Sequence, residues 1–194
     1  MKAPIPGQVK ARLAAEIGAV AAAEVYRRLG RQVVAAATWK DSRHYTTVWF
    51  TPATEAALVR QWLEDAANAE LRAQTGDSLG VRLSSAFDHV FAAGARRAVI
   101  IGSDCPGVDR RLLAEAFGAL DEDDVVLGPA LDGGYYLIGL SRPEPALFRD
   151  ISWSTARVAD QTRARAHALG LSCHLLRPLR DVDTLEDARA LGLQ

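Results

Sequence analysis

Helical and strand-like patterns of apolar residues alternate along most of this chain. In the helical segments, apolar residues recur every three or four positions, as Leu79, Leu83 and Phe87 do. These patterns predict helices over residues 9–17, 19–38, 53–67, 78–93, 109–120, 154–169 and 185–191. Runs rich in β-branched and aromatic residues predict strands over residues 45–51, 70–74, 97–102, 124–128, 135–140 and 172–176. Such alternation is typical of an α/β fold.

One predicted strand ends at an acidic residue in a tight turn. Val99, Ile100 and Ile101 are β-branched and uninterrupted by polar residues, which predicts a strand covered on both faces. Gly102 then ends the strand, and Asp104 follows at its carboxyl end. Ligands bind at this end of the strands in open α/β sheets. A carboxylate there suits a Mg²⁺ ion or a ribose hydroxyl, which indicates an enzyme that uses a nucleotide.

Length, charge and cysteine content narrow the class of protein. The 194 residues are enough for one domain, so we treat residues 1–194 as a single domain. A net charge of -1 gives no general attraction to nucleic acid or to anionic membranes. The sequence shows neither a signal peptide nor a run of about 20 apolar residues, so we expect a cytoplasmic protein without a membrane span. The two cysteines, Cys105 and Cys173, form no CxxC pair, and we expect reduced thiols.

The N-terminal segment gathers three cations around a rigid turn. Lys2, Lys10 and Arg12 flank Pro6 and Gly7, and a helix is predicted within the same segment. Cations and the N–H groups of a helix start together form an anion site that suits a di- or triphosphate. A solvated basic terminus has the same composition, so both interpretations stay open at this point. The segment contains neither the Walker A pattern nor the glycine pattern of dinucleotide-binding folds.

A glycine-rich segment, Asp132-Gly133-Gly134-Tyr135, joins two predicted strands. Consecutive glycines let a backbone approach a ligand closely, and Asp132 can accept hydrogen bonds from sugar hydroxyls. Asp-Gly is also the commonest dipeptide of tight hairpins. From these residues alone, a plain hairpin turn is the better interpretation.

Acidic residues gather before the last predicted helix. Thr184 is placed to cap this helix, and Asp187 favours its positive end. That structural role leaves Asp181 and Asp183 unexplained. Two carboxylates two positions apart on an extended segment point the same way, so one of them can share a metal ion with Asp104.

Two polar residues, Gln74 and Arg82, flank a short loop. They are candidates for contacts to a base or a phosphate, with helix capping and surface exposure as the alternative. Trp153-Ser154-Thr155 has the pattern of a helix N-cap that follows an aromatic core residue. The four histidines match no metal-binding pattern, and the sequence lacks the nucleophile elbow of a Ser-His-Asp hydrolase.

Six motifs, in order, resemble one bacterial family over nearly the whole chain. They are KAPIPGQVKARL, QTGDSLGVRL, VIIGSDCPG, VVLGPALDGGYYLIGL, ISWST and DVDTLEDA. The chain is similar to small glycosyltransferase-like proteins, some of them linked to arsenosugar biosynthesis, and to 2-phospho-lactate guanylyltransferases and molybdenum-cofactor nucleotidyltransferases. The resemblance implies a nucleotide-diphospho-sugar transferase fold of the GT-A type, a three-layer α/β sandwich with a mostly parallel mixed sheet. It also implies an apolar strand before Lys2. This sequence lacks that first strand, which suggests either a misassigned start codon or a truncated chain.

The resemblance also implies roles for individual residues. Asp104 binds a metal ion, Mg²⁺ or Mn²⁺, with Asp183 beside it, and Asp104 and Asp132 are the candidate catalytic residues. The candidates for binding the nucleotide and its phosphates, from residues and resemblance together, are Lys2, Pro6, Gly7, Lys10, Arg12, Gln74, Arg82 and Ser103. The candidates for the sugar or acceptor side are Asp132, Gly133, Gly134 and Tyr135.

These observations together predict a metal-dependent transferase that uses an activated nucleotide and a small-molecule acceptor. A glycosyltransferase would move the sugar of a nucleotide sugar and release a nucleoside diphosphate. A nucleotidyltransferase would move the nucleotide of a nucleoside triphosphate onto a phosphorylated acceptor and release pyrophosphate. The residues themselves do not separate the two reactions, and the family resemblance favours the first. A nucleotide-binding protein without catalytic activity is the third hypothesis.

Overall fold

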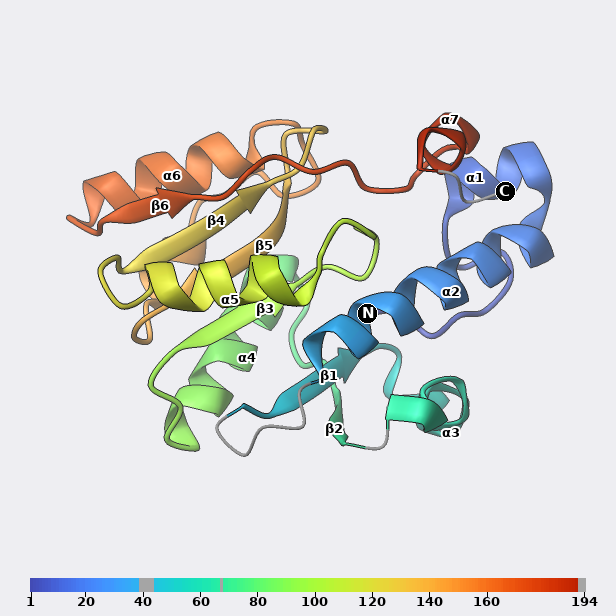
Figure 1. The fold of residues 1–194 in the computed structure, drawn as a ribbon, viewed down its shortest axis with the longest axis horizontal. Helices are drawn as coiled ribbons and strands as arrows, with labels where there is room; N and C mark the ends of the chain where they lie inside the picture. The colour runs from blue at the N-terminus through green and yellow to red at the C-terminus, as the bar shows by residue number, and fades with distance from the viewer. Residues whose placement is uncertain (39–43, 67, 192–194) are drawn as a thin grey trace. The chain divides into compact units, whose positions relative to one another are not determined.

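The computed structural model describes residues 1–38, 44–66 and 68–191, and the chain divides into two compact units (Figure 1). The first unit consists of Met1–Gln74, Ser103–Arg110 and Asp181–Gln194. The second unit consists of Thr75–Gly102 and Arg111–Arg180. Each unit has its own cluster of buried apolar side chains, and each is described by itself.

The first unit combines a two-stranded parallel sheet with helices. Its elements are α1 (Ala11–Ile17), α2 (Ala19–Ala37), β1 (Thr46–Phe50), η1 (Ala53–Glu55), α3 (Ala56–Trp62), η2 (Glu64–Ala66), β2 (Ala69–Ala73) and α7 (Leu185–Ala190). β1 and β2 pair in parallel with Val48 opposite Leu71. Parallel pairing needs a crossover connection, and α3 with its flanking single-turn helices supplies it.

The N-terminal residues lie alongside the end of β1. The Ala3 N–H donates to the Thr51 carbonyl at 2.8 Å, and the Thr51 N–H donates to the Met1 carbonyl at 3.0 Å. Lys2 and Thr51 thereby form a single parallel bridge. The sequence was expected to lack a first strand before the basic loop. In the structure, residues 1–3 form a short extended segment that pairs with the end of β1 and so joins the start of the basic loop to the sheet.

Helix α2, the long helix of the first unit in Figure 1, supplies much of that unit's core. Ala23, Tyr26 and Val34 of this helix belong to one buried cluster with Phe50 of β1 and Trp62 of α3. The ring centroids of Tyr26 and Trp62 are 5.6 Å apart. Burial of a large apolar side chain stabilises a fold by about 1.5–3 kcal/mol, so this cluster holds α2 firmly against the sheet.

The second unit is built on a four-stranded mixed sheet. Its elements are α4 (Leu79–Ala92), β3 (Ala98–Ile101), α5 (Arg110–Ala119, whose first residue belongs to the first unit), β4 (Val125–Pro129), β5 (Tyr135–Leu140), η3 (Pro145–Phe148), α6 (Val158–Ala168) and β6 (Cys173–Leu175). The strand order is β3-β5-β4-β6. β5 is antiparallel to both of its neighbours, whereas β4 and β6 are parallel.

Helices cover both faces of this sheet, which gives the second unit three layers. Phe87 of α4 and Ala166 of α6 lie in one buried cluster with Ile138 and Leu140 of β5. Because side chains alternate along a strand, Gly139 points to the opposite face. There a Cβ on Gly139 would lie 3.1 Å from the Leu120 side chain, which follows α5.

The predicted elements are all present, with three local differences. The helix predicted over residues 53–67 is broken into η1, α3 and η2. The acidic pair Glu64 and Asp65 would lie at the negative end of a continued helix, which is unfavourable. The helix predicted from residue 154 begins at Val158, so Ser154 and Thr155 lie in turns and the predicted N-cap is wrong. The interpretation of residues 99–101 as covered on both faces is also wrong. They are only partly buried, because β3 lies at an edge of the four-stranded sheet.

Among the described residues, no helix combines the length and the hydropathy that crossing a lipid bilayer requires.

Candidate functional site

Three of the predicted site residues meet in the first unit as a bridged ion pair. The Lys10 Nζ lies 2.9 Å from Asp104 Oδ2 and 3.1 Å from Asp183 Oδ1. The Lys10 side chain is only 3% exposed, whereas the carboxylates of Asp104 and Asp183 are 40% and 35% exposed. A buried ammonium therefore joins two carboxylates whose remaining surface faces solvent, and the pair can still accept a ligand from that side.

Backbone hydrogen bonds hold the two acidic residues in place. The Val182 N–H donates to the Asp104 carbonyl at 3.0 Å, which fixes the segment after β3 beside the segment before α7. Thr184 and Asp187 form a capping box at the start of α7, which confirms Thr184 as the predicted cap of this helix. The capping Asp187 also accepts the Asp183 N–H at 3.2 Å, so the orientation of Asp183 is set by the helix start.

The base of α7 is in turn attached to α1. The Leu185 N–H donates to Glu16 Oε1 at 3.1 Å, and Figure 1 shows α7 beside α1 within this unit. Lys10 lies at the start of α1, and Asp183 lies just before α7. Contact between the two helices therefore brings these two residues together, although they are near opposite ends of the sequence.

Lys10 itself has an unusual backbone. It is the N-cap residue of α1 and adopts the left-handed conformation, with φ 51° and ψ 51°. For a residue with a Cβ this conformation costs about 1–2 kcal/mol, and it persists only where surrounding contacts fix it. The turn before it is closed by the Gln8 N–H, which donates to the Ile5 carbonyl at 3.0 Å, and Val9 is buried. This hydrogen bond and the burial of Val9 fix the backbone of the basic loop, and so hold Lys10 in position beside the two carboxylates.

Arg12 is the exposed second cation of the site. Its guanidinium lies 3.5 Å from Asp183 Oδ2, and its side chain is 76% exposed. An ion pair of this length and exposure contributes well under about 1 kcal/mol to stability. Arg12 is therefore available to a ligand at little cost.

A hydroxyl pair connects the metal-site candidate Asp104 to the start of the basic loop. The Ser103 hydroxyl donates to Asp104 Oδ1 at 3.2 Å and lies 3.4 Å from the Tyr26 hydroxyl. The Tyr26 hydroxyl accepts the Lys2 N–H at 2.9 Å and donates to the Lys2 carbonyl at 3.2 Å. Tyr26 was not predicted as a site residue, because on α2 it occupies an ordinary position of the apolar face. No local signal in the sequence distinguishes it from a core residue.

Burial raises the pKa of the Tyr26 hydroxyl to about 12, and the neighbouring Asp104 acts in the same direction. A raised pKa means that folding holds this proton more tightly, so the unfolded chain ionises first as the pH rises from 10. We therefore expect the ionisation of Tyr26 to lower the free energy of unfolding by about 2 kcal/mol between pH 10 and pH 12. Tyr26→Phe should remove this contribution, while Tyr135, whose pKa burial also raises, keeps its own. The substitution should also cost about 1–2 kcal/mol at pH 7 through the lost hydrogen bonds. Urea unfolding at several pH values measures both effects, and an unchanged pH dependence in Tyr26→Phe would contradict this assignment.

The other predicted residues of the first unit lie apart from the ion pair or at its edge. Pro6 and Gly7 form the exposed tip of the basic loop, where Gly7 has a positive φ. The Gln74 N–H donates to the Phe50 carbonyl at 2.7 Å, which extends the pairing of β1 and β2. A ligand contact by any of these three residues stays a prediction.

The remaining predicted residues belong to the second unit. The Arg82 guanidinium donates to the Gly76 carbonyl at 2.9 Å and braces the loop before α4. The ring of Tyr135 packs edge-on against Trp153 at a centroid distance of 6.4 Å. Burial raises the pKa of Tyr135 above its ordinary value, as expected for a side chain among apolar neighbours. A contact of Tyr135 with a sugar or an acceptor stays a prediction.

The segment Asp132-Gly133-Gly134 forms the tight connection between β4 and β5. The Gly134 N–H donates to Asp132 Oδ1 at 2.8 Å, and the Ala130 N–H donates to the Gly134 carbonyl at 3.0 Å. Gly133 has φ +89°, and a Cβ placed on it would lie 2.1 Å from the Ala156 carbonyl oxygen. This geometry explains the consecutive glycines as a hairpin turn packed under the segment before α6. The exposed Asp132 keeps its predicted role as a hypothesis.

Packing also explains one residue in each of two motifs, Gly80 in QTGDSLGVRL and Trp153 in ISWST. A Cβ on Gly80 of α4 would lie 2.9 Å from the indole nitrogen of Trp153. The small residue in one motif thus makes room for the tryptophan of another. Such a pairing is invisible in the sequence because the two positions are joined only by the fold.

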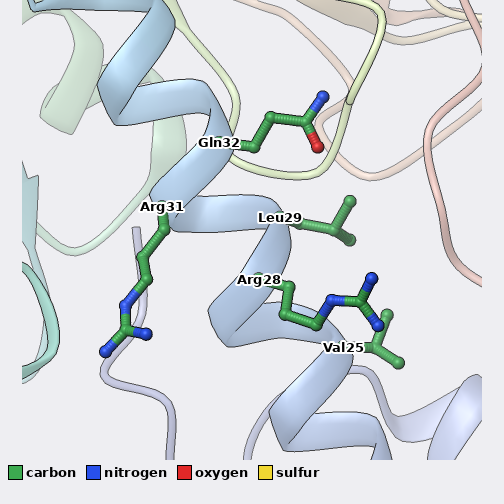
Figure 2. Close-up of a pocket in the computed structure, with 5 residues that line it drawn as sticks. All are labelled: Val25, Arg28, Leu29, Arg31 and Gln32. Atoms are coloured by element: carbon green, nitrogen blue, oxygen red, sulfur yellow. The ribbon is translucent and has the colours of Figure 1, made fainter.

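A hollow beside α2 contains no residue of the predicted site. It is lined by Val25, Arg28, Leu29, Arg31 and Gln32 (Figure 2). Figure 2 shows the Arg31 guanidinium pointing away from Arg28, and Arg31 Nε donates to the Trp62 carbonyl at 2.9 Å. The guanidinium groups of Arg28 and Arg31 therefore do not converge on one ligand position. We keep the Lys10 ion pair, and not this hollow, as the candidate site.

Comparisons with solved structures confirm the predicted fold class, an α/β fold of the nucleotide-diphospho-sugar transferase type. A protein of Desulfovibrio desulfuricans, provisionally assigned as a nucleotide-diphospho-sugar transferase, is 32% identical with a TM-score of 0.91, over 98% of this chain and 83% of that chain. A cytidylyltransferase from Leptospira borgpetersenii is 12% identical with a TM-score of 0.56, over 84% of this chain and 73% of that chain. CMP:2-keto-3-deoxy-manno-octonic acid synthetase, solved with CTP, is 12% identical with a TM-score of 0.55, over 86% of this chain and 87% of that chain. At 12% identity these two likenesses concern the fold alone.

Sequence comparison gives the family. No curated protein sequence matches the chain significantly. Residues 34–155 match the model of the DUF2064 family, described as an uncharacterized protein conserved in bacteria, and this chain belongs to that family.

Proposed function

We propose that this protein is a metal-dependent transferase that acts on an activated nucleotide, with its phosphate and metal site at Lys10, Asp104 and Asp183. The observation that carries the proposal is the buried Lys10 ammonium held between two part-exposed carboxylates. Few structural needs explain a buried cation and two acidic groups on loops, because removing charges from water is costly. The relative from Desulfovibrio desulfuricans, provisionally assigned as a nucleotide-diphospho-sugar transferase, supports the same class of substrate.

The two carboxylates suit Mg²⁺ or Mn²⁺ by the chemistry of their donors. Mg²⁺ prefers oxygen ligands, keeps several waters and is usually held by one or two carboxylates together with substrate phosphates. Asp104 and Asp183 provide that number. Among the described residues there is no group of three or more histidine, cysteine or acidic side chains that would form a closed metal site. When bound, the metal would supply positive charge against the leaving phosphate.

The protein's own cations would hold the phosphates. Lys10 is fixed by its surroundings and offers a compact charge, whereas the exposed Arg12 can swing toward a ligand and bind two phosphate oxygens at once. Ser103 and Tyr26 would act indirectly, by fixing Asp104 and the start of the loop. Positioning and charge stabilisation of this kind account for most of the catalysis that phosphate chemistry requires.

Glycosyl transfer from a nucleotide sugar is the leading reaction, in line with the name given to the 32% identical relative. Nucleotidyl transfer is the second candidate, because the cytidylyltransferase and the synthetase solved with CTP share the fold. The two reactions differ in the bond that breaks: the sugar–oxygen bond in the first and the α–β phosphate link in the second. A small-molecule acceptor completes either reaction.

Ligand-induced thermal stabilisation tests the proposal. Nucleoside triphosphates and nucleotide sugars are screened at 1 mM, each with and without Mg²⁺, and we expect at least one to raise the melting temperature only with Mg²⁺. Release of pyrophosphate or of a nucleoside diphosphate with candidate acceptors then identifies the reaction. Binding without product from any acceptor would favour a nucleotide-binding protein without catalytic activity. No stabilisation by any nucleotide would contradict the proposal.

A further inference from the structure

We infer that, in the ligand-free protein, the Lys10 ammonium occupies the cation position between Asp104 and Asp183 and keeps divalent metal out of it. A metal ion would then bind there only together with a phosphate-bearing ligand that draws Lys10 away. The inference rests on the proposed function, and it adds an order of events to it. It starts from the two contacts of the buried Nζ, 2.9 Å and 3.1 Å long.

The four carboxylate oxygens of Asp104 and Asp183 are already engaged. Asp104 Oδ2 and Asp183 Oδ1 contact the Lys10 ammonium. Asp104 Oδ1 accepts the Ser103 hydroxyl at 3.2 Å, and Asp183 Oδ2 faces Arg12 at 3.5 Å. Each oxygen therefore has a partner already. A metal ion that ligates both residues must replace the ammonium at the two inner oxygens.

The balance of charge also opposes a metal ion at this position. The two carboxylates carry a charge of about −2, which one ammonium and the nearby guanidinium of Arg12 largely balance. A dication placed beside a retained ammonium would face a like charge at a few ångströms, in surroundings that screen it poorly because the Lys10 side chain is 3% exposed. Free metal should therefore bind weakly while Lys10 stays in place.

A phosphate-bearing ligand can move the Lys10 side chain. The lysine side chain is a flexible four-carbon stem with a compact charge, so its Nζ can leave the carboxylates without a change in the backbone. A di- or triphosphate brings two or more negative charges that can receive both Lys10 and Arg12. Metal and phosphate ligand then bind with positive cooperativity, and each raises the affinity of the other by the same factor.

Manganese binding in the absence of nucleotide tests the inference directly. The free Mn²⁺ signal in electron paramagnetic resonance is titrated against wild type, Lys10→Gln, Arg12→Gln and the double variant Lys10→Gln/Asp104→Asn. We expect Lys10→Gln to bind Mn²⁺ at least 10-fold more tightly than wild type. Arg12→Gln, which removes one charge but leaves the bridge, should differ from wild type by less than threefold. The double variant should lose the gain.

The possible failures separate this inference from the proposed function. Equal Mn²⁺ affinity in wild type and Lys10→Gln would overturn the inference and leave the metal site standing. No binding by any variant, alone or with inorganic pyrophosphate, would overturn the inference and the metal part of the proposed function together. Thermal unfolding of each variant confirms that it is folded before titration.

A second measurement uses the wild-type contacts and does not depend on the Lys10→Gln variant. The sequence contains three lysines, Lys2, Lys10 and Lys40, so a lysine-selective ¹³Cε label gives a three-signal NMR spectrum. Lys2→Arg and Lys40→Arg remove the other two signals and identify that of Lys10. We expect 5 mM Mg²⁺ alone to leave the Lys10 signal in place, and Mg²⁺ with pyrophosphate to move it. A shift caused by Mg²⁺ alone would overturn the inference.

Discussion

Asp104→Asn is expected to abolish the effect of Mg²⁺ on nucleotide binding while leaving the fold unchanged. The amide has the shape of the carboxylate but only one oxygen, which can take the place of Asp104 Oδ2 beside the Lys10 ammonium. Its NH2 group then faces the Ser103 hydroxyl, which can reverse and accept a hydrogen bond. The Asp104 carbonyl that accepts the Val182 N–H belongs to the backbone and is retained. What is lost is one of the two charges that would hold the metal ion.

The expected size of this effect is a loss of about 100-fold or more in affinity for the metal–nucleotide complex, because the loss of even an outer-shell partner of a metal ligand costs about 10–100-fold. Isothermal titration with the nucleotide that stabilises wild type, with and without Mg²⁺, measures it. Affinity without Mg²⁺ should not fall, because Lys10 is then held by one carboxylate fewer. Asp109→Asn is the matched control, because it removes an exposed carboxylate from the same segment of the first unit. A full Mg²⁺ effect in Asp104→Asn would remove Asp104 from the metal site.

The members of this site could be proposed from the sequence, whereas their arrangement could not. Asp104 follows an apolar strand, and Asp183 precedes a capped helix, so local patterns and the family resemblance suffice to select them. The bridge that Lys10 makes between them depends on how α1 and α7 are brought together. No local pattern reports that contact, because it joins residues near opposite ends of the chain.

The same distinction holds for the fold. The helices and strands follow from the spacing of apolar residues, and the elements found differ from those predicted mainly at their ends. The error at residues 154–157 arises because Ser154 and Thr155 have the composition of an N-cap but form turns instead. Trp153, the residue before them, packs against Gly80 of α4, a long-range contact that local composition does not show. Tertiary contacts override local preference at such places.

The glycine pair between β4 and β5 offers the clearest test of a structural against a chemical role. Gly133→Ala is expected to lower the free energy of unfolding by about 3 kcal/mol, of which about 1–2 kcal/mol is the strain of a side chain at a positive φ. The rest is the forced movement of backbone, since the new Cβ would lie 2.1 Å from the Ala156 carbonyl oxygen. Urea unfolding followed by circular dichroism measures the change.

Gly94→Ala is the control that separates the two contributions. Gly94 also has a positive φ, +93° against +89° at Gly133, but no atom lies within 4 Å of the position of its added Cβ. It should therefore show the strain alone, about 1–2 kcal/mol. Equal losses in the two variants would mean that the contact with Ala156 yields without cost.

Asp132→Asn tests the chemical role of this turn, because its amide oxygen can still accept the Gly134 N–H. A loss of transfer activity in Asp132→Asn at unchanged stability would assign chemistry to Asp132, and the glycines beside it would then serve to hold that side chain at the turn.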